Sequence, residues 1–528
     1  MTEIEIFSLI RSFPGLSSGP GPAARVSDDA VRSQARQAQE LAARLEASAA
    51  AALLRDRTGA GKTVVCVAAA VTLARRGVCQ RILVIAPNEH VVGRWSETQE
   101  LLWAQARAED KRVDWHFKTH GGLARKGAKS DAFDLVIIDE AHRGLQTPGA
   151  WHDGLGMAAK GARLLLVSAT PFQLSTEGLI RMLTLGERPL EGAAKLRSYG
   201  RTVNQLLHAW RRAGECVDDP SVRGLKDQLA EGWSDAREVL ERVGPAPMGD
   251  VEAPRAPGRL AAPATAGWLK AYHVARLVPE FLPNLKSGDM FQRRLISSSE
   301  AFWAGRSGAE LLSEAKRNPR FARFAEALKS ALGLSKDHPK VAATASWTLA
   351  RAAERRHVLI FCVFKETQTA ISEVLQASGG PLEVHAPDHA GQLKPYLARF
   401  RAVPERDRVP LVIVARDNLS ESIDLDGGEA ALLHHDLPWN PARITQRWGR
   451  LVRRSSGFRP VPDDQHVYPL LPLEFDQRMA EVVMARRQQV DMMVPGELLG
   501  SGDEEDDQPP WMALFSQASE GLSPVRAR

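Results

Sequence analysis

The sequence predicts an α/β protein of two domains, each built on a mostly parallel sheet, with a mostly helical segment between them. Short apolar runs alternate with helix-like stretches, which is typical of a parallel sheet with helices on both faces. This series occurs twice along the chain, and 528 residues are too many for one hydrophobic core. The predicted strands are residues 51–54, 82–85, 135–138 and 164–167 in the first series and 358–363, 411–414, 431–434 and 467–471 in the second.

The texture of the chain divides it into five parts. Residues 1–28 contain several prolines and glycines and are predicted to be a flexible leader. Residues 29–186 form the first α/β domain, and residues 187–340 form a mostly helical insertion with a proline-rich loop. Residues 341–497 form the second α/β domain, which ends in a helix. The acidic residues near the start of 498–528 predict a disordered tail.

The composition is that of an ordinary globular protein, with 44% hydrophobic and 25% charged residues. The net charge of +5 mildly favours a polyanionic partner. Four cysteines lack the spacing of a disulfide framework or a zinc site, which fits a reducing compartment. The N-terminus lacks a basic export signal, and no apolar run reaches 18 residues, so we expect no membrane association and a cytoplasmic location.

A glycine-rich loop follows the first predicted strand and precedes a helix-like stretch. Such a loop cradles phosphates with its backbone N–H groups and the N-terminus of the next helix. Lys62 would reach the β- and γ-phosphates, and the Thr63 hydroxyl would hold Mg²⁺. The usual pattern begins with glycine where Asp56 stands, so the alternative is an ordinary glycine-rich turn before Lys-Thr. The predicted nucleotide-binding residues are Asp56, Thr58, Gly59, Ala60, Gly61, Lys62 and Thr63.

A pair of acids ends the predicted strand at residues 135–138, in the run LVIIDEAH. Ligands bind at the carboxyl ends of strands in parallel sheets. Asp139 could hold Mg²⁺ there, and Glu140 could polarise an attacking water. The alternative is a solvated acidic turn. It is less favoured because a predicted strand precedes both the glycine-rich loop and this acid pair.

Small hydroxyl residues end the predicted strand at residues 164–167, in the run LLLVSATPF. Ser168 and Thr170 could couple a nucleotide site to a moving partner domain. An ordinary turn before Pro171 explains the run equally well when it is taken alone.

A basic run, DLPWNPARITQRWGRLVRR, occupies residues 436–454. Gln446, Arg447, Arg450 and Arg453 have helical spacing, and the last two would share one helix face. Two guanidinium groups aimed at one place suit a γ-phosphate in its transition state. The alternative is a basic surface helix, although the tryptophans in this run argue against a fully solvated face.

Together these motifs resemble the superfamily 2 helicases and translocases, and most closely the Swi/Snf-type branch that includes bacterial RNA-polymerase-recycling and phage-defence helicases. In that branch the phosphate loop begins with Asp, as at Asp56, the acid box reads DEAH, and the third motif reads S/T-A-T-P. The sixth motif, Q-R-x-G-R-x-x-R, is matched from Gln446 to Arg453. The resemblance covers most of residues 31–494 and implies two RecA-like domains with a helical insertion between them.

The resemblance also implies roles for residues outside these runs. The fifth motif is RDNLSESIDL at 416–425, where Asp424 matches a nucleotide-site position but Arg416 replaces Thr and Ser422 replaces Gly. An adenine-reading Gln lies upstream of the loop in relatives, and Gln37 and Gln39 both stand at a suitable distance, with a slight preference for Gln39. His142, Ser168 and Thr170 would couple the nucleotide site to motion.

The function implied by the resemblance is a nucleic-acid-stimulated ATPase that uses ATP and Mg²⁺. Lys62, Glu140, Arg450 and Arg453 would be catalytic, Gln446 would help bind the nucleotide, and nucleic acid, in relatives usually double-stranded DNA, would be the track. Two alternatives stay open, namely an ATP-gated nucleic-acid clamp or scaffold with protein partners in a larger complex, and a subunit of an anti-phage system.

Overall fold

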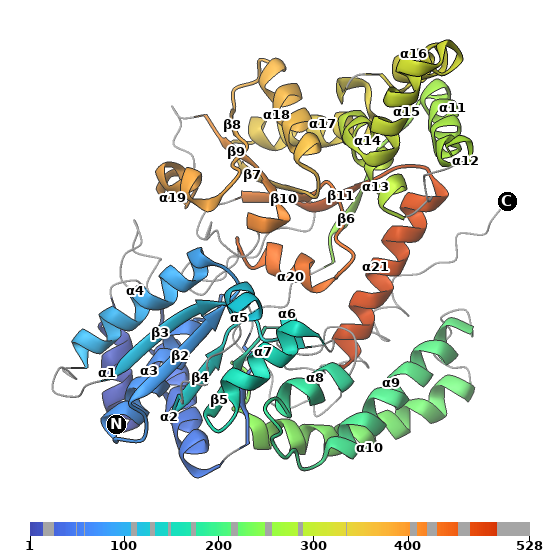
Figure 1. Cartoon of the computed structure of the whole chain (residues 1–528). Coiled ribbons are helices and arrows are strands. Elements are labelled where there is room, and N and C mark those ends of the chain that lie inside the picture. Colours follow the sequence, from blue (N-terminus) through green and yellow to red (C-terminus); the bar gives the residue numbers. More distant parts are fainter. Residues whose placement is uncertain are drawn as a thin grey trace. The chain divides into compact units, whose positions relative to one another are not determined.

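The chain forms two compact units, each with its own sheet (Figure 1). The described residues up to 253, together with 486–493, form unit 1, and those from 254 to 485 form unit 2. The computed structural model describes residues 1–13, 26–48, 50–56, 59–106, 113–126, 133–145, 149–169, 176–212, 220–248, 256–282, 289–333, 335–401, 409–419, 430–451 and 465–493.

Unit 1 is built on a five-stranded sheet in the order β1-β5-β4-β2-β3, and every neighbouring pair is parallel. Its middle strand, β4, is buried along its whole length, as the continuous apolar run LVII predicts for a sheet covered on both faces. The strands are β1 (Ala52–Leu54), β2 (Arg81–Ala86), β3 (Asp114–Thr119), β4 (Leu135–Ile138) and β5 (Arg163–Val167).

Helices cover both faces of the unit 1 sheet. Leu54 and Val84 face α1 to α4, whereas Leu53 and Ile85 face α5 to α10, because successive side chains of a strand point to opposite faces. The helices are α1 (Glu3–Arg11), α2 (Asp28–Ala47), α3 (Lys62–Arg75), α4 (Glu89–Gln105), α5 (His120–Lys126), α6 (His142–Leu145), α7 (Ala150–Ala159), α8 (Thr176–Leu183), α9 (Ala193–Arg212) and α10 (Pro220–Val243).

Two boundaries of unit 1 correct the sequence predictions. Residues 3–11 of the predicted leader form α1, because Thr2 caps the helix and Ile6 and Ile10 are buried in the core shared with α2 and α3. Helices α9 and α10 of the predicted insertion belong to unit 1, because apolar residues such as Tyr199 and Leu240 are buried in the core of its sheet.

Unit 2 is built on a six-stranded parallel sheet in the order β6-β11-β10-β7-β9-β8. All four strands of the second predicted series are present. The proline-rich segment was predicted as a loop, but it contributes an edge strand, β6, which pairs with β11. The strands are β6 (Gly258–Ala261), β7 (His357–Cys362), β8 (Glu383–His385), β9 (Leu411–Arg416), β10 (Ala430–His434) and β11 (His466–Leu470).

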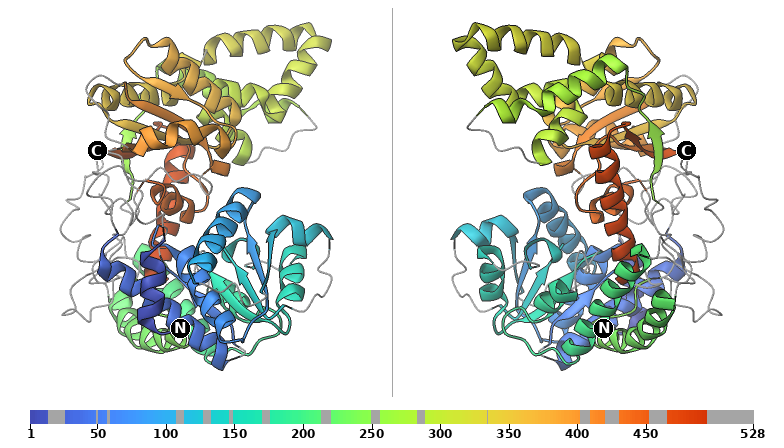
Figure 2. Two further views of the ribbon diagram at one scale, coloured as in Figure 1. Left: turned by 90° about the vertical axis from the view of Figure 1, so that its left-hand side faces the viewer. Right: turned by 90° about the vertical axis from the view of Figure 1, so that its right-hand side faces the viewer.

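The helices of unit 2 form two groups. Helices α17 and α18 cover one face of the sheet, where Ile360 and Val414 are buried. Helices α11 to α16 and α21 share a second core around Trp268 and Phe302, and the yellow-green helices extend to one side of the sheet in both views of Figure 2. The helices are α11 (Ala266–Arg276), α12 (Val278–Phe281), α13 (Asp289–Ser297), α14 (Ser299–Ala304), α15 (Arg306–Arg317), α16 (Pro319–Leu332), α17 (Pro339–Ala353), α18 (Lys365–Ala377), α19 (Lys394–Arg401), α20 (Ala442–Trp448) and α21 (Glu474–Met493).

The predicted insertion is therefore not one element, since its first two helices belong to unit 1 and its remainder to unit 2. The predicted terminal helix is confirmed as α21. The predicted acidic tail lies outside the described residues. Within the described part of the chain, none of the helices combines the length and apolar character that a membrane span requires.

Candidate nucleotide site

The carboxyl ends of the unit 1 strands gather the predicted nucleotide-site residues at one edge of the sheet. Strands β1, β5 and β4 are neighbours and end in register. Asp56 follows β1, Asp139 and Glu140 follow β4, and Ser168 follows β5. The Ser168 N–H donates to the Leu54 carbonyl (3.0 Å), which continues the register beyond the strand ends. Four predicted side chains therefore stand where parallel sheets bind ligands.

The phosphate loop ends at a helix N-terminus that no described side chain caps. Gly59 and Gly61 have φ angles of 91° and 87°, a region that favours glycine. Gly61 is the N-cap of α3, and the first turn of that helix contains no acidic residue. The first N–H groups of α3 and the positive end of its dipole are thus suited to an anion.

Contacts from α2 and from the loop itself hold the loop in this shape. Lys62 Nζ donates to the Asp56 carbonyl oxygen at 3.0 Å. Gln34 Nε2 donates to the Ala60 carbonyl oxygen at 2.9 Å, and a Cβ on Gly61 would meet that nitrogen at 2.3 Å. Gly61 is therefore required both by its φ and by the close approach of Gln34.

Asp56 is fully buried and anchors the start of the loop. Its Oδ1 accepts hydrogen bonds from Gln37 Nε2 (3.1 Å) and from the Met248 backbone N–H (2.9 Å). Gln37 Nε2 also donates to the Ala246 carbonyl oxygen at 2.9 Å. The aspartate that stands in place of the usual glycine thus joins three separate segments of unit 1.

The structure places Gln37, and not Gln39, against the loop. Residues two apart on an α-helix point about 200° away from each other, so both cannot face the loop. Gln37 is therefore the one of the two that contacts the loop, and the choice of Gln39 or Gln37 as the adenine-reading residue stays a prediction. Gln34, one turn earlier on the same face of α2, contacts the loop as well.

Asp139 is held in place by two hydrogen bonds. Trp95 Nε1 donates to its Oδ2, and the Glu140 N–H donates to its Oδ1, both at 2.9 Å. Burial and the charge of Glu140 raise the pKa of Asp139 to about 6, although these hydrogen bonds and Lys62 oppose the shift. A further positive charge beside Asp139 would favour its ionised form.

Glu140 has a φ of 47°, in the left-handed region that few non-glycine residues adopt. Such strain is found where a side chain is aimed for function. His142 Nδ1 lies 3.3 Å from Glu140 Oε2 and 2.8 Å from Ser168 Oγ. His142 therefore connects the acid after β4 with the hydroxyl after β5.

The donor set fits Mg²⁺ bound together with phosphates. The described residues contain no group of three or more His, Cys, Asp or Glu side chains that could hold a metal ion alone. Mg²⁺ at nucleotide sites takes one or two protein ligands and completes its shell with water and phosphate oxygens. The Asp139 carboxylate and the Thr63 hydroxyl in the first turn of α3 are ligands of this kind.

At the sheet edge of unit 2, Arg447 forms a filled polar cluster. Its fully buried guanidinium donates to Asp417 through Nε (3.0 Å) and Nη2, and to His434 Nδ1 (3.1 Å) and the Asp436 carbonyl (3.0 Å) through Nη1. Burial alone would raise the pKa of Asp417, but Arg447 and Arg443 hold it below its usual value. Arg447 is thus a buried strut.

The segment QRRLISSSEAF at 292–302 completes the interior of unit 2. Ser297 Oγ donates to Asp436 Oδ2 (2.9 Å), which also accepts from the Val363 N–H (2.9 Å). Both Ser297 and Ser298 are within hydrogen-bond distance of the Thr367 hydroxyl. This segment therefore connects the helical group of unit 2 to its sheet.

The helix of the basic run ends earlier than its spacing predicts. Helix α20 stops at Trp448, and the N–H groups of Arg450 and Leu451 bond three residues back, to Arg447 and Trp448. The chain therefore continues beyond α20 in a tighter, three-residue turn. Gln446 and Arg450 are both buried in unit 2. Four predicted site residues lie outside the described residues, namely Thr58, Thr170, Asp424 and Arg453.

Some residues of the site were not predicted from the sequence. Trp95, which bonds Asp139, comes from the run ILVIAPNEHVVGRW, and its place after a strand was the available signal. His120 Nε2 lies 2.8 Å from the Asp139 carbonyl oxygen, and no local pattern indicated it. Met248 is 192 residues from Asp56 in sequence, so only the fold could bring them together.

Two family models match the chain. Residues 29–173 match the model for the res subunit of type III restriction enzymes, and residues 340–455 match the model for the helicase conserved C-terminal domain. The chain thus contains two separate regions that are similar to these domains. Its two parallel sheets have a RecA-like two-domain fold.

Known proteins add further similarities. The chain is 22% identical over 431 residues to an uncharacterized ATP-dependent helicase, YqhH, of Bacillus subtilis (strain 168), and the match covers 79% of this chain and 71% of YqhH. It is 12% identical to S. cerevisiae Dbp5 bound to RNA and ADP BeF3, with a TM-score of 0.41 and coverage of 97% and 99%. It is 17% identical to the Hef helicase domain of Pyrococcus furiosus, with a TM-score of 0.37, and the match covers 84% of this chain and 96% of that structure.

Proposed function

We propose that this protein is a helicase or translocase that couples ATP hydrolysis to movement along, or remodelling of, double-stranded DNA. The observation that carries the proposal is the convergence of Lys62, Asp139 and Glu140 with the uncapped α3 N-terminus at one sheet edge. Phosphoryl transfer to water requires positioning and charge stabilisation, which this set supplies.

The described residues of unit 1 take distinct roles in the proposal. The loop from Gly59 to Thr63 and the α3 N-terminus would bind the phosphates, and Lys62 would reach the β- and γ-phosphates. Asp139 and the Thr63 hydroxyl would hold Mg²⁺, which supplies neutralising charge when bound. Glu140 would orient the attacking water and accept its proton. His142, Ser168 and Thr170 would couple the nucleotide bound at the site to the motion of the partner domain.

The basic run of unit 2 supplies the second part of the proposal. Arg450 and Arg453 would provide positive charge to the γ-phosphate in the transition state, with Gln446 and Asp424 as further nucleotide contacts. Arg450→Ala should therefore keep ATP binding and lose hydrolysis. Loss of binding and folding together would indicate a structural role for Arg450 instead.

The choice of double-stranded DNA is supported by the resemblance of the motif set to Swi/Snf-type translocases and by the weakly basic net charge. ATPase rates should be compared with duplex DNA, single-stranded DNA and RNA, at several salt concentrations because phosphate contacts are salt-dependent. We expect the largest stimulation with duplex DNA. Equal or greater stimulation by RNA would contradict this track.

Displacement of a triplex-forming strand from duplex DNA distinguishes movement from clamping. A translocase removes the third strand only with ATP and only from DNA on which it can travel. ATP turnover and DNA retention without displacement would favour the ATP-gated clamp, in which a partner protein carries out the remaining work.

A further inference from the structure

Residues 244–248, here called the strap, follow α10 and are the last described residues before the chain passes from unit 1 into unit 2. The strap lies against β1, since a Cβ on Gly244 would be 1.9 Å from the Leu53 carbonyl oxygen. It also lies against α2, because the Ala246 carbonyl accepts from Gln37. Pro245 is buried within it.

The strap is bonded directly to the phosphate loop. The Met248 N–H donates to Asp56 Oδ1 at 2.9 Å, and the Met248 side chain forms a buried apolar pair with Ala60 of the loop. Asp56 is fully buried, so this bond is not weakened by competition with water. One polar and one apolar contact therefore join the strap to two loop positions.

The backbone of the same aspartate contacts the phosphate-reaching lysine. Lys62 Nζ donates to the Asp56 carbonyl oxygen at 3.0 Å. A lysine that moves to a phosphate must release that carbonyl. The side chain of Asp56 thus bonds the strap, while its backbone carbonyl bonds Lys62. The carbonyl loses that hydrogen bond when Lys62 turns to a phosphate.

We propose that Asp56 is a positioning residue that couples the phosphate loop to the strap, so that a nucleoside triphosphate bound at the loop orders the strap. The inference rests on the proposed ATP-dependent function. Phosphate contacts reduce the motion of the loop. Because Met248 contacts Asp56 and Ala60, its motion is reduced as well. Asp56 acts through the loop backbone and touches no reacting atom.

Hydrogen exchange of the strap amides, with and without AMP-PNP and Mg²⁺, tests the coupling in the full-length protein. Wild-type protein should show slower exchange at Met248 when nucleotide is bound. Asp56→Ala should still bind AMP-PNP, lose this protection, and reduce kcat by roughly tenfold with little change in KM. Asp56→Asn should keep the protection, because its amide oxygen can accept both hydrogen bonds.

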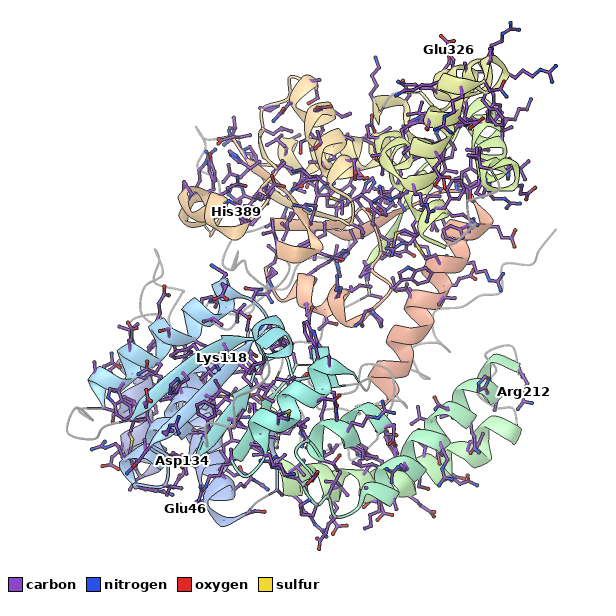
Figure 3. All side chains as sticks on the ribbon, in the orientation of Figure 1. Glu46, Lys118, Asp134, Arg212, Glu326 and His389 are labelled. Atoms are coloured by element: carbon purple, nitrogen blue, oxygen red, sulfur yellow. The ribbon has the colours of Figure 1, made fainter. Side chains whose placement is uncertain are left out.

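A second variant removes the same bond from the other side. Met248→Pro deletes the donating N–H while leaving Asp56 intact, and its effect on kcat should not add to that of Asp56→Ala in the double variant. Asp134→Ala is the matched control, since Asp134 (labelled in Figure 3) likewise accepts two backbone N–H bonds, from Gln80 and Arg81, but precedes β4 at the other end of the strand. It should leave strap protection unchanged.

The outcomes separate the two proposals. Wild-type protein that binds no AMP-PNP overturns the proposed function and the coupling together. Wild-type protein that binds AMP-PNP without any change in strap exchange overturns the coupling alone. Nucleotide-dependent protection that persists in Asp56→Ala, or additive effects of Asp56→Ala and Met248→Pro, also overturns it.

Discussion

The carboxyl edges of the two sheets are completed in opposite ways. In unit 1 the edge ends in glycines with positive φ, an uncapped helix and a lysine that bonds a backbone carbonyl. In unit 2 the edge ends in Arg447, whose buried guanidinium bonds Asp417, His434 and the Asp436 backbone. The first edge is suited to receive an anion, whereas the second is already filled by the protein.

Arg447 of the basic run lies within α20 and is part of the filled edge. Arg450, three residues later, lies beyond the end of α20 and is also buried in unit 2. Changes at the first edge should therefore alter activity, and changes at the second should first alter stability. The following variants test that division.

Lys62→Ala should have the largest effect. Loss of the charge that reaches the phosphates should reduce DNA-stimulated ATP hydrolysis by about 10²–10³-fold or more, while the thermal unfolding midpoint stays near that of the wild type. Hydrolysis rates and calorimetry measure the two quantities. Normal turnover would remove the loop from the proposed active site.

Arg447→Ala should destabilise unit 2 by about 3 kcal/mol, because it leaves the buried Asp417 with less counter-charge. Chemical denaturation measures this free energy of unfolding. Arg443→Ala is the matched control, since Arg443 bonds the other oxygen of Asp417 but is partly exposed, so its loss should cost under about 1 kcal/mol. Equal losses of unfolding free energy in the two variants would show that the burial of Arg447 does not make it the more important of the two for stability.

Glu140→Gln should slow hydrolysis by about 100-fold or more while ATP binding persists, because the amide cannot accept a proton from water. Single-turnover hydrolysis and nucleotide titration measure the two steps. A variant that binds ATP and turns over normally would place the general base elsewhere.

Gln37→Ala should lower the free energy of unfolding by about 1–3 kcal/mol, because the Asp56 and Ala246 oxygens lose a buried donor. Gln39→Ala, two residues along the same helix, should change stability and nucleotide affinity little. Thermal unfolding with and without nucleotide compares them. A larger effect at Gln39 would contradict the geometry of α2.

The smallest effect concerns pH and the interior of unit 2. Burial lowers the pKa of His338 to about 3, whereas an unfolded histidine titrates near 6.5. The unfolded chain therefore binds a proton that the folded chain does not, and stability falls as the pH drops below 6.5. His338→Gln should remove about 1.4 kcal/mol of this loss at pH 5.5. An unchanged pH dependence would show that His338 charges within the fold.

Much of the fold followed from the sequence because its central strands are continuous apolar runs. Strands such as β4 and β7 are buried on both faces, and their mostly apolar residues predict this burial. β3 (DWHFKT) and β8 (EVH) were not predicted, since both are partly exposed and mix polar with apolar residues. β6 was concealed by the prolines around it.

The site was partly predictable for a related reason. Lys62, Asp139 and Glu140 carry their signal in adjacent residues, so a local pattern suffices. The choice between Gln37 and Gln39 depended on the rotation of α2, and the partners of Asp56 depended on a segment nearly two hundred residues away. Contacts between distant segments are set by the packing of whole elements, which no local pattern encodes.

The position of β6 has a consequence for how the chain is made. β6 pairs only with β11 within the described sheet, and β11 begins about 200 residues later. At about 5–20 residues per second of synthesis, β6 waits roughly 10–40 s on the ribosome before its partner emerges. During that interval the rest of the sheet can assemble from β7 to β10, but its edge beside β10 stays open. A fragment that starts at residue 341 would contain β11 but lack β6, so its sheet would keep an open edge beside β11 permanently.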